Sequence, residues 1–163
     1  MNKQPISAKL AKLLSSKLKF YKTAVKIISK SKNFINRQGV GCIDDQQTGV
    51  AYINSKGHRD SVACLLPNGY PIKSSMYGLI TEERNAPMLK VLRGYLKIQE
   101  SEVFEFHQLI QAIQDVHDYA FPFNRFPTKE NFDMKKFNEG MEILLEEYMP
   151  KLKKTAEKLA STT

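Results

Sequence analysis

The sequence predicts an α+β fold, in which a long basic helix precedes a small antiparallel sheet and then three or four packed helices. Three observations lead to this prediction. Apolar residues recur at helical spacing over residues 1–36, glycines divide residues 39–80 into short β-prone runs, and helical spacing returns over residues 81–160. A chain of 163 residues can bury one hydrophobic core, so we expect a single domain (1–163) made of these three segments.

The N-terminal segment has the pattern of an amphipathic helix. Pro5 suits the first turn, and no glycine or further proline occurs between it and Lys32. The apolar residues, at i, i+3/i+4 and i+7 spacing, are Ile6, Leu10, Leu13, Leu14, Leu18, Tyr21, Val25 and Ile28. At about 100° per residue they form one stripe about 140° wide, and five lysines lie on the opposite side of the helix.

The positive charge of this segment is not compensated by acidic residues. Residues 1–43 contain ten Lys or Arg and no Asp or Glu, whereas residues 44–163 contain 15 basic and 17 acidic residues. The whole net charge of +8 therefore comes from the first quarter of the chain. Such asymmetry is typical of chains that bind nucleic acid, an anionic membrane or an acidic protein surface.

We predict that these basic residues contact the phosphates of nucleic acid. The candidate binding residues are Lys12, Lys19, Lys22, Lys26, Lys30 and Arg37, joined by Lys151, Lys153 and Lys154 near the C-terminus. Lysine acts on phosphate as a point charge, so we expect little sequence preference. Other interpretations of the helix stay open: packing on the body with solvated lysines, an anionic membrane surface, an acidic protein groove, or a homo-oligomer.

The middle segment predicts the small sheet. The runs VGCI (40–43) and GVAYI (49–53) suit two strands joined by a polar loop of about five residues. The run SVACLL (61–66) suits a third strand or the first turns of a buried helix, and KSSMYGLI (73–80) suits another short strand.

Polar residues of this segment raise the question of an active site. Cys42, His58 and Asp60 supply a thiol, a base and an orienting carboxylate, the residue types of thiol catalysis. No recognisable motif surrounds them, and Cys42 and Cys64 also suit small buried hydrophobes. Closely spaced zinc-ligand pairs such as C-x-x-C are absent from the sequence. We therefore predict a protein that is not an enzyme, with no metal and no cofactor.

The last segment predicts the packed helices. We expect one helix over residues 81–98, one over residues 101–121, and one from Thr128 or Asn131 to the C-terminal lysines. Pro150 should kink the last helix or begin a new one. His117 with Asp118 is a candidate general base, although ordinary polar groups at a helix end fit the same pattern.

The stretch YAFPFNRFP (119–127) is the most unusual loop, because two prolines and four aromatic residues share nine positions. Aromatic residues and arginine are the types that dominate binding energy at protein interfaces. The candidate partner-binding residues are Phe121, Phe123, Arg125 and Phe126. The alternative is a loop that buries its rings in the core between two helices.

Cellular location is also predicted from composition. The N-terminus lacks the apolar h-region of a signal peptide, and no run of about 18 apolar residues could span a membrane. Two cysteines do not make a disulfide framework. We expect a cytoplasmic protein with reduced thiols.

The stretches VACLLPNG (62–69), AIQDVHD (112–118) and FNEGMEILLEEY (137–148) carry a resemblance. Together with the glycine-rich hairpin they resemble uncharacterised small accessory proteins of phages and mobile elements, which share a Cys-x-x-Leu-type helix start and a His-Asp helix end. The resemblance implies no activity. We expect an accessory protein that binds the nucleic-acid backbone; the alternative is a protein-interaction module, such as an inhibitor or assembly factor, that uses the N-terminal helix or the 119–127 loop.

Overall fold

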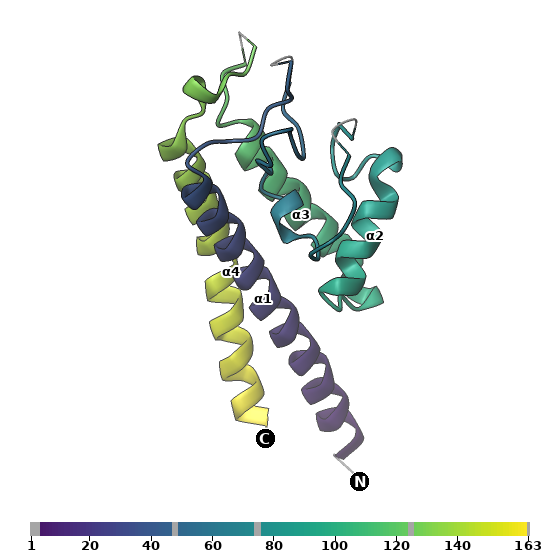
Figure 1. The fold of residues 1–163 in the computed structure, drawn as a ribbon. Coiled ribbons are helices and arrows are strands. Elements are labelled where there is room, and N and C mark those ends of the chain that lie inside the picture. The colour runs from purple at the N-terminus through teal and green to yellow at the C-terminus, as the bar shows by residue number, and fades with distance from the viewer. Residues whose placement is uncertain (1–3, 47–48, 74–75, 124–125, 163) are drawn as a thin grey trace.

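The computed structural model describes residues 4–46, 49–73, 76–123 and 126–162, with side chains from Ser7 onward. Its frame consists of four α-helices: α1 (Gln4–Gln38), α2 (Ala86–Tyr95), α3 (Val103–Asp118) and α4 (Met134–Thr162) (Figure 1). Short 3-10 turns occur at η1 (Ala63–Leu65), η2 (Glu83–Asn85), η3 (Glu100–Glu102) and η4 (Lys129–Asn131).

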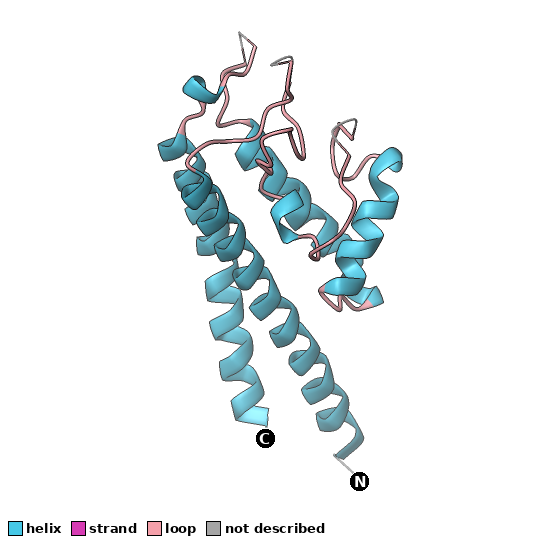
Figure 2. Cartoon of the chain, viewed as in Figure 1, coloured by secondary structure: helices cyan, strands magenta, loops and turns pink. Residues whose placement is uncertain are grey.

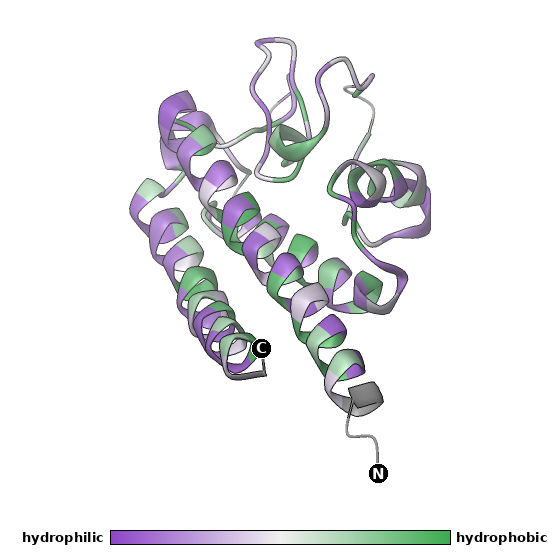
Figure 3. Cartoon of the chain, turned by 90° about the horizontal axis from the view of Figure 1, so that it is seen from below, coloured by the Kyte–Doolittle hydropathy of each residue, from purple (hydrophilic) through white to green (hydrophobic). Residues whose placement is uncertain are grey.

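The two longest helices, α1 and α4, lie side by side and run in opposite directions, so the start of α1 and the end of α4 lie at the same end of the molecule (Figure 1). The rings of Tyr21 and Tyr148 are 6.2 Å apart between centroids, and the side-chain amides of Asn36 and Asn138 exchange hydrogen bonds of 2.7 and 3.0 Å. α3 packs against this pair, and α2 lies beyond α3 in the same view. Hydrophilic and hydrophobic segments alternate along both long helices, as expected for helices with one buried face (Figure 3).

The predicted N-terminal helix is confirmed, but its buried face covers only part of its apolar stripe. The buried residues of α1 are Phe20, Ala24, Ile27, Ile28, Ser31 and Ile35. Phe20 and Ile27, which the stripe derived from sequence placed at its edge, are therefore part of the buried face. Toward the N-terminus, Leu10 and Leu13 remain 46% and 52% exposed. Each fully buried Ile or Phe contributes about 1.5–3 kcal/mol, so residues 20–35 hold α1 to the body.

The α+β prediction is wrong, because the described residues form no sheet. Residues 40–46 and 49–62 are loops and turns with two isolated antiparallel bridges, Ile43–Val50 and Ile53–Arg59 (Figure 2). The runs 40–43 and 49–53 do approach each other as a hairpin, since the Asp44 N–H donates to the Gly49 carbonyl at 2.9 Å. Residues 61–66 contain the η1 turn, and the described part of 73–80 has no strand.

Side chains take the hydrogen bonds that a β-ladder would have made. The Gln38 side chain donates to the carbonyls of Val40 and Arg59 and accepts from the Arg59 N–H. The Asn54 amide donates to the Ile43 carbonyl at 3.0 Å. Every buried backbone group needs a partner, and here side chains supply it, so the β-prone runs have no need to extend into strands.

The helical half follows the predicted order with shorter boundaries. α2 begins at Ala86, because η2 occupies the preceding residues, and α3 begins at Val103 after a capping box between Gln99 and Glu102. α4 continues through Pro150 and forms one helix to Thr162, so Pro150 does not begin a new helix.

Candidate functional site

The outer side of α1 carries a row of exposed basic residues, which we call the basic face: Lys12, Lys19, Lys22, Lys26, Lys30 and Arg37. At 100° per residue these six lie within a sector of about 80°, opposite the buried residues of the helix. With a rise of 1.5 Å per residue, the row from Lys12 to Arg37 is about 38 Å long. The helix ties the whole row to the body through its buried residues 20–35.

No salt bridge among the described residues involves the basic face. Lys32, which the sequence places within the apolar sector of the same helix, instead pairs with Glu142 of α4. The pairs Lys22–Lys26 and Lys26–Lys30 are separated by four residues, a spacing at which like charges repel by about 0.2–0.5 kcal/mol. The basic face is therefore an uncompensated positive surface.

The lysines of α4 do not extend this surface as one group. Lys151 contacts Glu147 at 3.3 Å and Glu105 at 3.8 Å, and its ammonium lies 4.8 Å from the Tyr148 ring centroid. Lys153 and Lys154 are exposed. Consecutive residues of a helix point about 100° apart, so these two lysines face different directions.

The aromatic loop is divided between core and surface. Phe121 is only 4% exposed and packs its ring 4.9 Å from Phe132, so it is not available to a partner. Phe123 and Phe126 are 79% and 74% exposed. The Lys136 ammonium lies 5.7 Å from the Phe123 ring centroid. The remaining candidate, Arg125, lies outside the described residues.

The structure does not assemble the candidate thiol site. Cys42 is fully buried, and its Sγ donates to the backbone carbonyl of His58 at 3.2 Å rather than to the His58 ring. Burial, followed by the nearby Asp60 carboxylate, raises the pKa of the Cys42 thiol well above its usual value. Burial likewise raises the pKa of Cys64 to about 12. A nucleophilic cysteine needs the opposite shift, so neither thiol is activated.

Both ring nitrogens of His117 are occupied. Nε2 accepts a hydrogen bond of 2.9 Å from the Cys42 N–H, which places the ring proton on Nδ1, where it donates to Asp118 at 2.8 Å. The ring is completely buried between Phe121 and Phe132. His117 therefore has no free nitrogen with which to act as a general base, and instead holds the hairpin to α3.

Sequence reasoning missed two polar residues of the interior, Tyr52 and Gln114. Gln114 of α3 accepts from the Ile80 N–H at 2.7 Å and donates to the Tyr52 hydroxyl at 3.1 Å. Both side chains line a cavity with Asp60 and Asp118. Gln114 and His117 occupy positions on the buried face of an amphipathic helix, and polar residues at such positions are the signal that could have found this region.

Two further kinds of feature do not occur among the described residues. None of the helices combines the length and apolar character required to cross a membrane. No three His, Cys, Asp or Glu side chains of the described residues are grouped so that they could hold a metal ion.

The chain was compared with protein-family models, with curated proteins and with solved structures, and none of the three comparisons finds a match. The resemblance to accessory proteins of phages and mobile elements therefore stays a prediction.

Proposed function

We propose that this protein binds the phosphate backbone of nucleic acid along the basic face of α1, with little sequence preference. The observation that carries the proposal is the row of six exposed cations on one side of α1. The helix contains no acidic residue, and none of the ion pairs among the described residues involves these six cations. We further propose that the protein is a non-enzymatic accessory protein and that it acts in the cytoplasm.

Counterion release supplies the driving force. Six phosphate contacts on B-DNA give a slope of about −5 for log K against log salt concentration. A row of about 38 Å matches about 11 base pairs at 3.4 Å each, so one double-helical turn is long enough to engage it. Because the contacts go to phosphates, we expect duplexes of different sequence to bind about equally.

The test is binding of the full chain to labelled double-stranded DNA and RNA over a range of salt concentrations. The variant changes Lys12, Lys19, Lys22, Lys26 and Lys30 to Gln. We expect wild-type binding to fall steeply with salt, and the variant to lose most of the affinity and most of the slope.

The matched control removes the same charge elsewhere, by changing the exposed lysines Lys56, Lys73, Lys90, Lys129 and Lys135 to Gln. Its affinity should stay much closer to that of the wild type, because the basic face is intact. Equal losses in both variants would mean that only net charge matters, and absence of wild-type binding at low salt would refute the proposal.

A second candidate function is protein docking through the aromatic loop. The observation in its favour is that Phe123 and Phe126 are more than 70% exposed, although aromatic rings are usually buried. Capture of a partner from native lysate should then survive moderate salt and fail in Phe123→Ala and Phe126→Ala. Tyr95→Ala, at another exposed aromatic residue, is the control. Capture unchanged by the two loop variants would exclude this role.

A further inference from the structure

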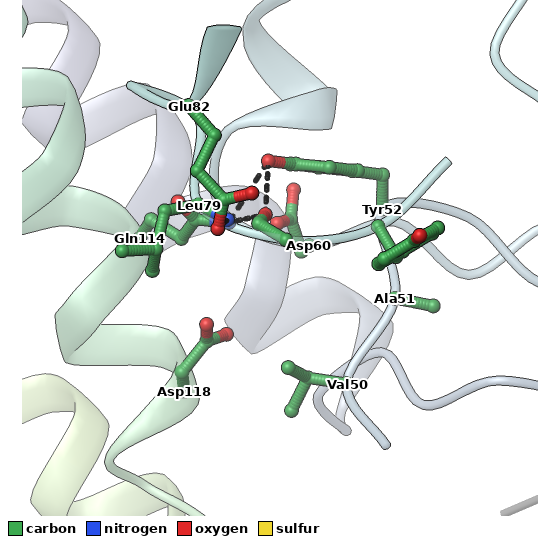
Figure 4. Close-up of a pocket in the computed structure, with 10 residues that line it drawn as sticks. Val50, Ala51, Tyr52, Asp60, Leu79, Glu82, Gln114 and Asp118 are labelled. Carbon is green, nitrogen blue, oxygen red and sulfur yellow. Dashed lines mark hydrogen bonds between the residues drawn. The ribbon is translucent and has the colours of Figure 1, made fainter. Parts of the chain in front are cut away.

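A cavity of about 280 Å³ lies between the loop residues 50–60, the loop around Gly78 and α3. Figure 4 shows Glu82 at one side of this space and Asp118, which projects from α3, at the other. Asp60 is a third carboxylate on its wall. Three acidic side chains around one cavity stand out in a chain whose net charge is +8.

The neutral polar groups of the cavity are already satisfied. The Tyr52 hydroxyl donates to the Gly78 carbonyl at 2.6 Å and accepts from the Gln114 amide at 3.1 Å. The same amide donates to the Gly78 carbonyl at 3.1 Å, and the Gln114 Oε1 accepts from the Ile80 N–H. These hydrogen bonds give the wall a fixed shape and use the donor hydrogens of both Tyr52 and Gln114.

Glu82 at the edge of the cavity is engaged as well. Its carboxylate accepts from the Leu79 N–H at 3.0 Å and pairs with Arg84 at 2.7 Å. The Arg84 guanidinium lies 4.5 Å from the centroid of the Tyr77 ring. Glu82 and its neighbours therefore form a fixed rim, and the open polar groups have to be sought deeper in the cavity.

Asp60 presents an open carboxylate oxygen there. Its side chain is 98% buried, and Oδ1 accepts from the backbone N–H groups of Val62 and Ala63 at 3.0 and 2.6 Å. No hydrogen bond among the described residues reaches Oδ2. Every fully buried side-chain oxygen of those residues does have a hydrogen-bond partner, so Oδ2 is not fully buried. Oδ2 must therefore face the open space of the cavity, where a buried carboxylate oxygen needs a donor.

Asp118 presents a second such oxygen. Oδ1 accepts from the Nδ1–H of His117, whose other nitrogen is fixed by the Cys42 N–H. No other hydrogen bond among the described residues reaches the Asp118 carboxylate, which lines the cavity, so we take its Oδ2 as open there. The rest of the lining is largely apolar, with Val50, Ala51 and Leu79 as its aliphatic residues.

We propose that this cavity binds a small organic cation, with an alkylammonium or alkylguanidinium group donating to Asp60 and Asp118 and its alkyl part against the aliphatic wall. Two carboxylates with open acceptor oxygens favour a cation over an anion. The volume suits a group of the size of a lysine or arginine side chain. The cation can be a free molecule or a side chain of a bound peptide, and both offer the same chemistry.

The electrostatics of Asp60 add a pH dependence. The pKa of Asp60 is raised to about 7, mainly by burial; His117 and the N–H groups of Ala63 and Val62 act to lower it, and the nearby Asp118 acts to raise it. The other titratable groups that face Asp60 are Cys42, Tyr52 and Cys64. Cation binding favours the ionised carboxylate, so affinity should increase as pH rises through about 7.

The test uses NMR titration of the full chain with ethylguanidinium up to about 10 mM, because a ligand this small binds in the millimolar range. Ethylurea has the same shape without the charge and is the matched ligand control. Ac-Ala-Arg-Ala-NH2 reports on a side-chain source. We expect ethylguanidinium to shift the amide signals of Ala51 and Leu79, while those of Lys19 and Lys26 on α1 stay in place.

The test variant is Asp118→Asn, which keeps an acceptor for His117. It should weaken ethylguanidinium binding at least about tenfold, as expected for the loss of one charge-assisted hydrogen bond. Asp115→Asn removes the same charge one turn earlier, outside the cavity, and should bind within about twofold of wild type. Circular dichroism checks that both variants fold.

The outcomes divide clearly. Binding of ethylguanidinium but not of the peptide supports a free small molecule, and binding of the peptide supports a side-chain ligand. The proposal is overturned if neither cation shifts the cavity amides, if ethylurea binds as well, or if Asp118→Asn binds as tightly as wild type. None of these results depends on nucleic-acid binding.

Discussion

The basic face of α1 and the cavity beside α3 hold charge under opposite conditions. The six cations of the basic face are exposed, so water and salt screen each of them within about 8 Å at physiological ionic strength. Asp60 is 98% buried, where an ionised carboxylate interacts strongly with every neighbour. The exposed charges act only as a large set, whereas each carboxylate of the cavity has a large effect of its own.

This difference determines what each region can recognise. A set of screened cations can grip a polyanion, for which the number of contacts matters more than the position of each one. Two carboxylates in a cavity depend on the direction of every hydrogen bond around them, which suits a small ligand of defined shape. The comparison can be tested on one scale, the free energy of unfolding, by changing charges in the two regions.

The largest effect is expected for Asp60→Asn. Burial raises the pKa of Asp60 to about 7, above its unfolded value, so the folded state keeps a proton that the unfolded chain loses between about pH 4 and pH 7. Wild-type stability therefore falls as pH rises through that window. The variant should be more stable by at most about 4 kcal/mol at pH 8, and by about 1–2 kcal/mol at pH 5.

Urea unfolding of wild type and Asp60→Asn from pH 5 to pH 8 measures this difference. The control is Asp45→Asn on the surface, where hydrogen bonds from Ser55 lower the pKa of the carboxylate. Its sign is opposite: Asp45→Asn should be destabilised by a constant amount from pH 5 to pH 8, because the stability from Asp45 is lost only as pH falls below about 3.9. Parallel curves for wild type and Asp60→Asn would show that Asp60 is not held in a costly ionised state.

His117→Phe should have the next largest effect. Phenylalanine can keep the ring contacts with Phe121 and Phe132, but it leaves the buried Cys42 N–H without an acceptor. An unsatisfied buried donor costs about 1–3 kcal/mol, so the variant should be destabilised by that amount in urea unfolding.

The matched control is His107→Phe, at a histidine that is only half-buried on the same helix and contacts Arg93 at 3.3 Å. Its cost should stay below about 1 kcal/mol, because water can replace the lost contact. If both histidine variants unfold at the same urea concentration, His117 does not hold the hairpin to α3.

Glu142→Gln tests an ion pair at the edge of the α1–α4 contact. Glu142 is 52% exposed and pairs with Lys32, whose side chain is 25% exposed. A pair this open contributes at most about 1 kcal/mol, and 1 M salt should remove most of it. The control is Glu139→Gln, which removes an exposed pair in which Glu139 lies 3.9 Å from Lys135, and it should leave the free energy of unfolding almost unchanged. An equal loss in both variants would exclude a special role for the Lys32–Glu142 pair.

The long helices of the fold could be predicted from the sequence, because their information is local and repeated. The apolar spacing of α1 continues over many turns, so single exceptions such as Lys17 and Lys32 did not hide it. The same holds for α3 and α4. The exposed position of the basic face also follows from this periodicity, since a charge-rich side of an amphipathic helix faces water.

The sheet was predicted wrongly because runs of four or five residues carry too little information. VGCI and GVAYI have β-prone composition, but the partners of their backbone groups come from Gln38, Asn54 and His117. His117, which accepts a hydrogen bond from the Cys42 N–H, is 75 residues away from Cys42 in the sequence. Contacts at this separation leave no local pattern, and they override a weak propensity.

The cavity was beyond sequence reasoning for the same reason. Asp60 and Asp118 come from a loop and a helix end, and only the tertiary fold brings them to one space. In sequence terms His117 and Asp118 suited a general base. In the structure the Nδ1–H of His117 instead orients the Asp118 carboxylate. This depends on the Cys42 N–H donor, whose position only the folded hairpin defines.

The five-lysine variant of the basic face should have the smallest effect on stability and the largest effect on nucleic-acid binding. Changing Lys12, Lys19, Lys22, Lys26 and Lys30 to Gln removes like-charge pairs at i,i+3 and i,i+4, each worth about 0.2–0.5 kcal/mol, while helix propensity stays about equal. The variant should therefore be as stable as wild type or more stable by less than about 1 kcal/mol in urea unfolding, although its nucleic-acid affinity falls by orders of magnitude. Destabilisation by more than 1 kcal/mol would instead show that these lysines hold the fold together, and that the basic face is part of the packing of α1 rather than a surface for a partner.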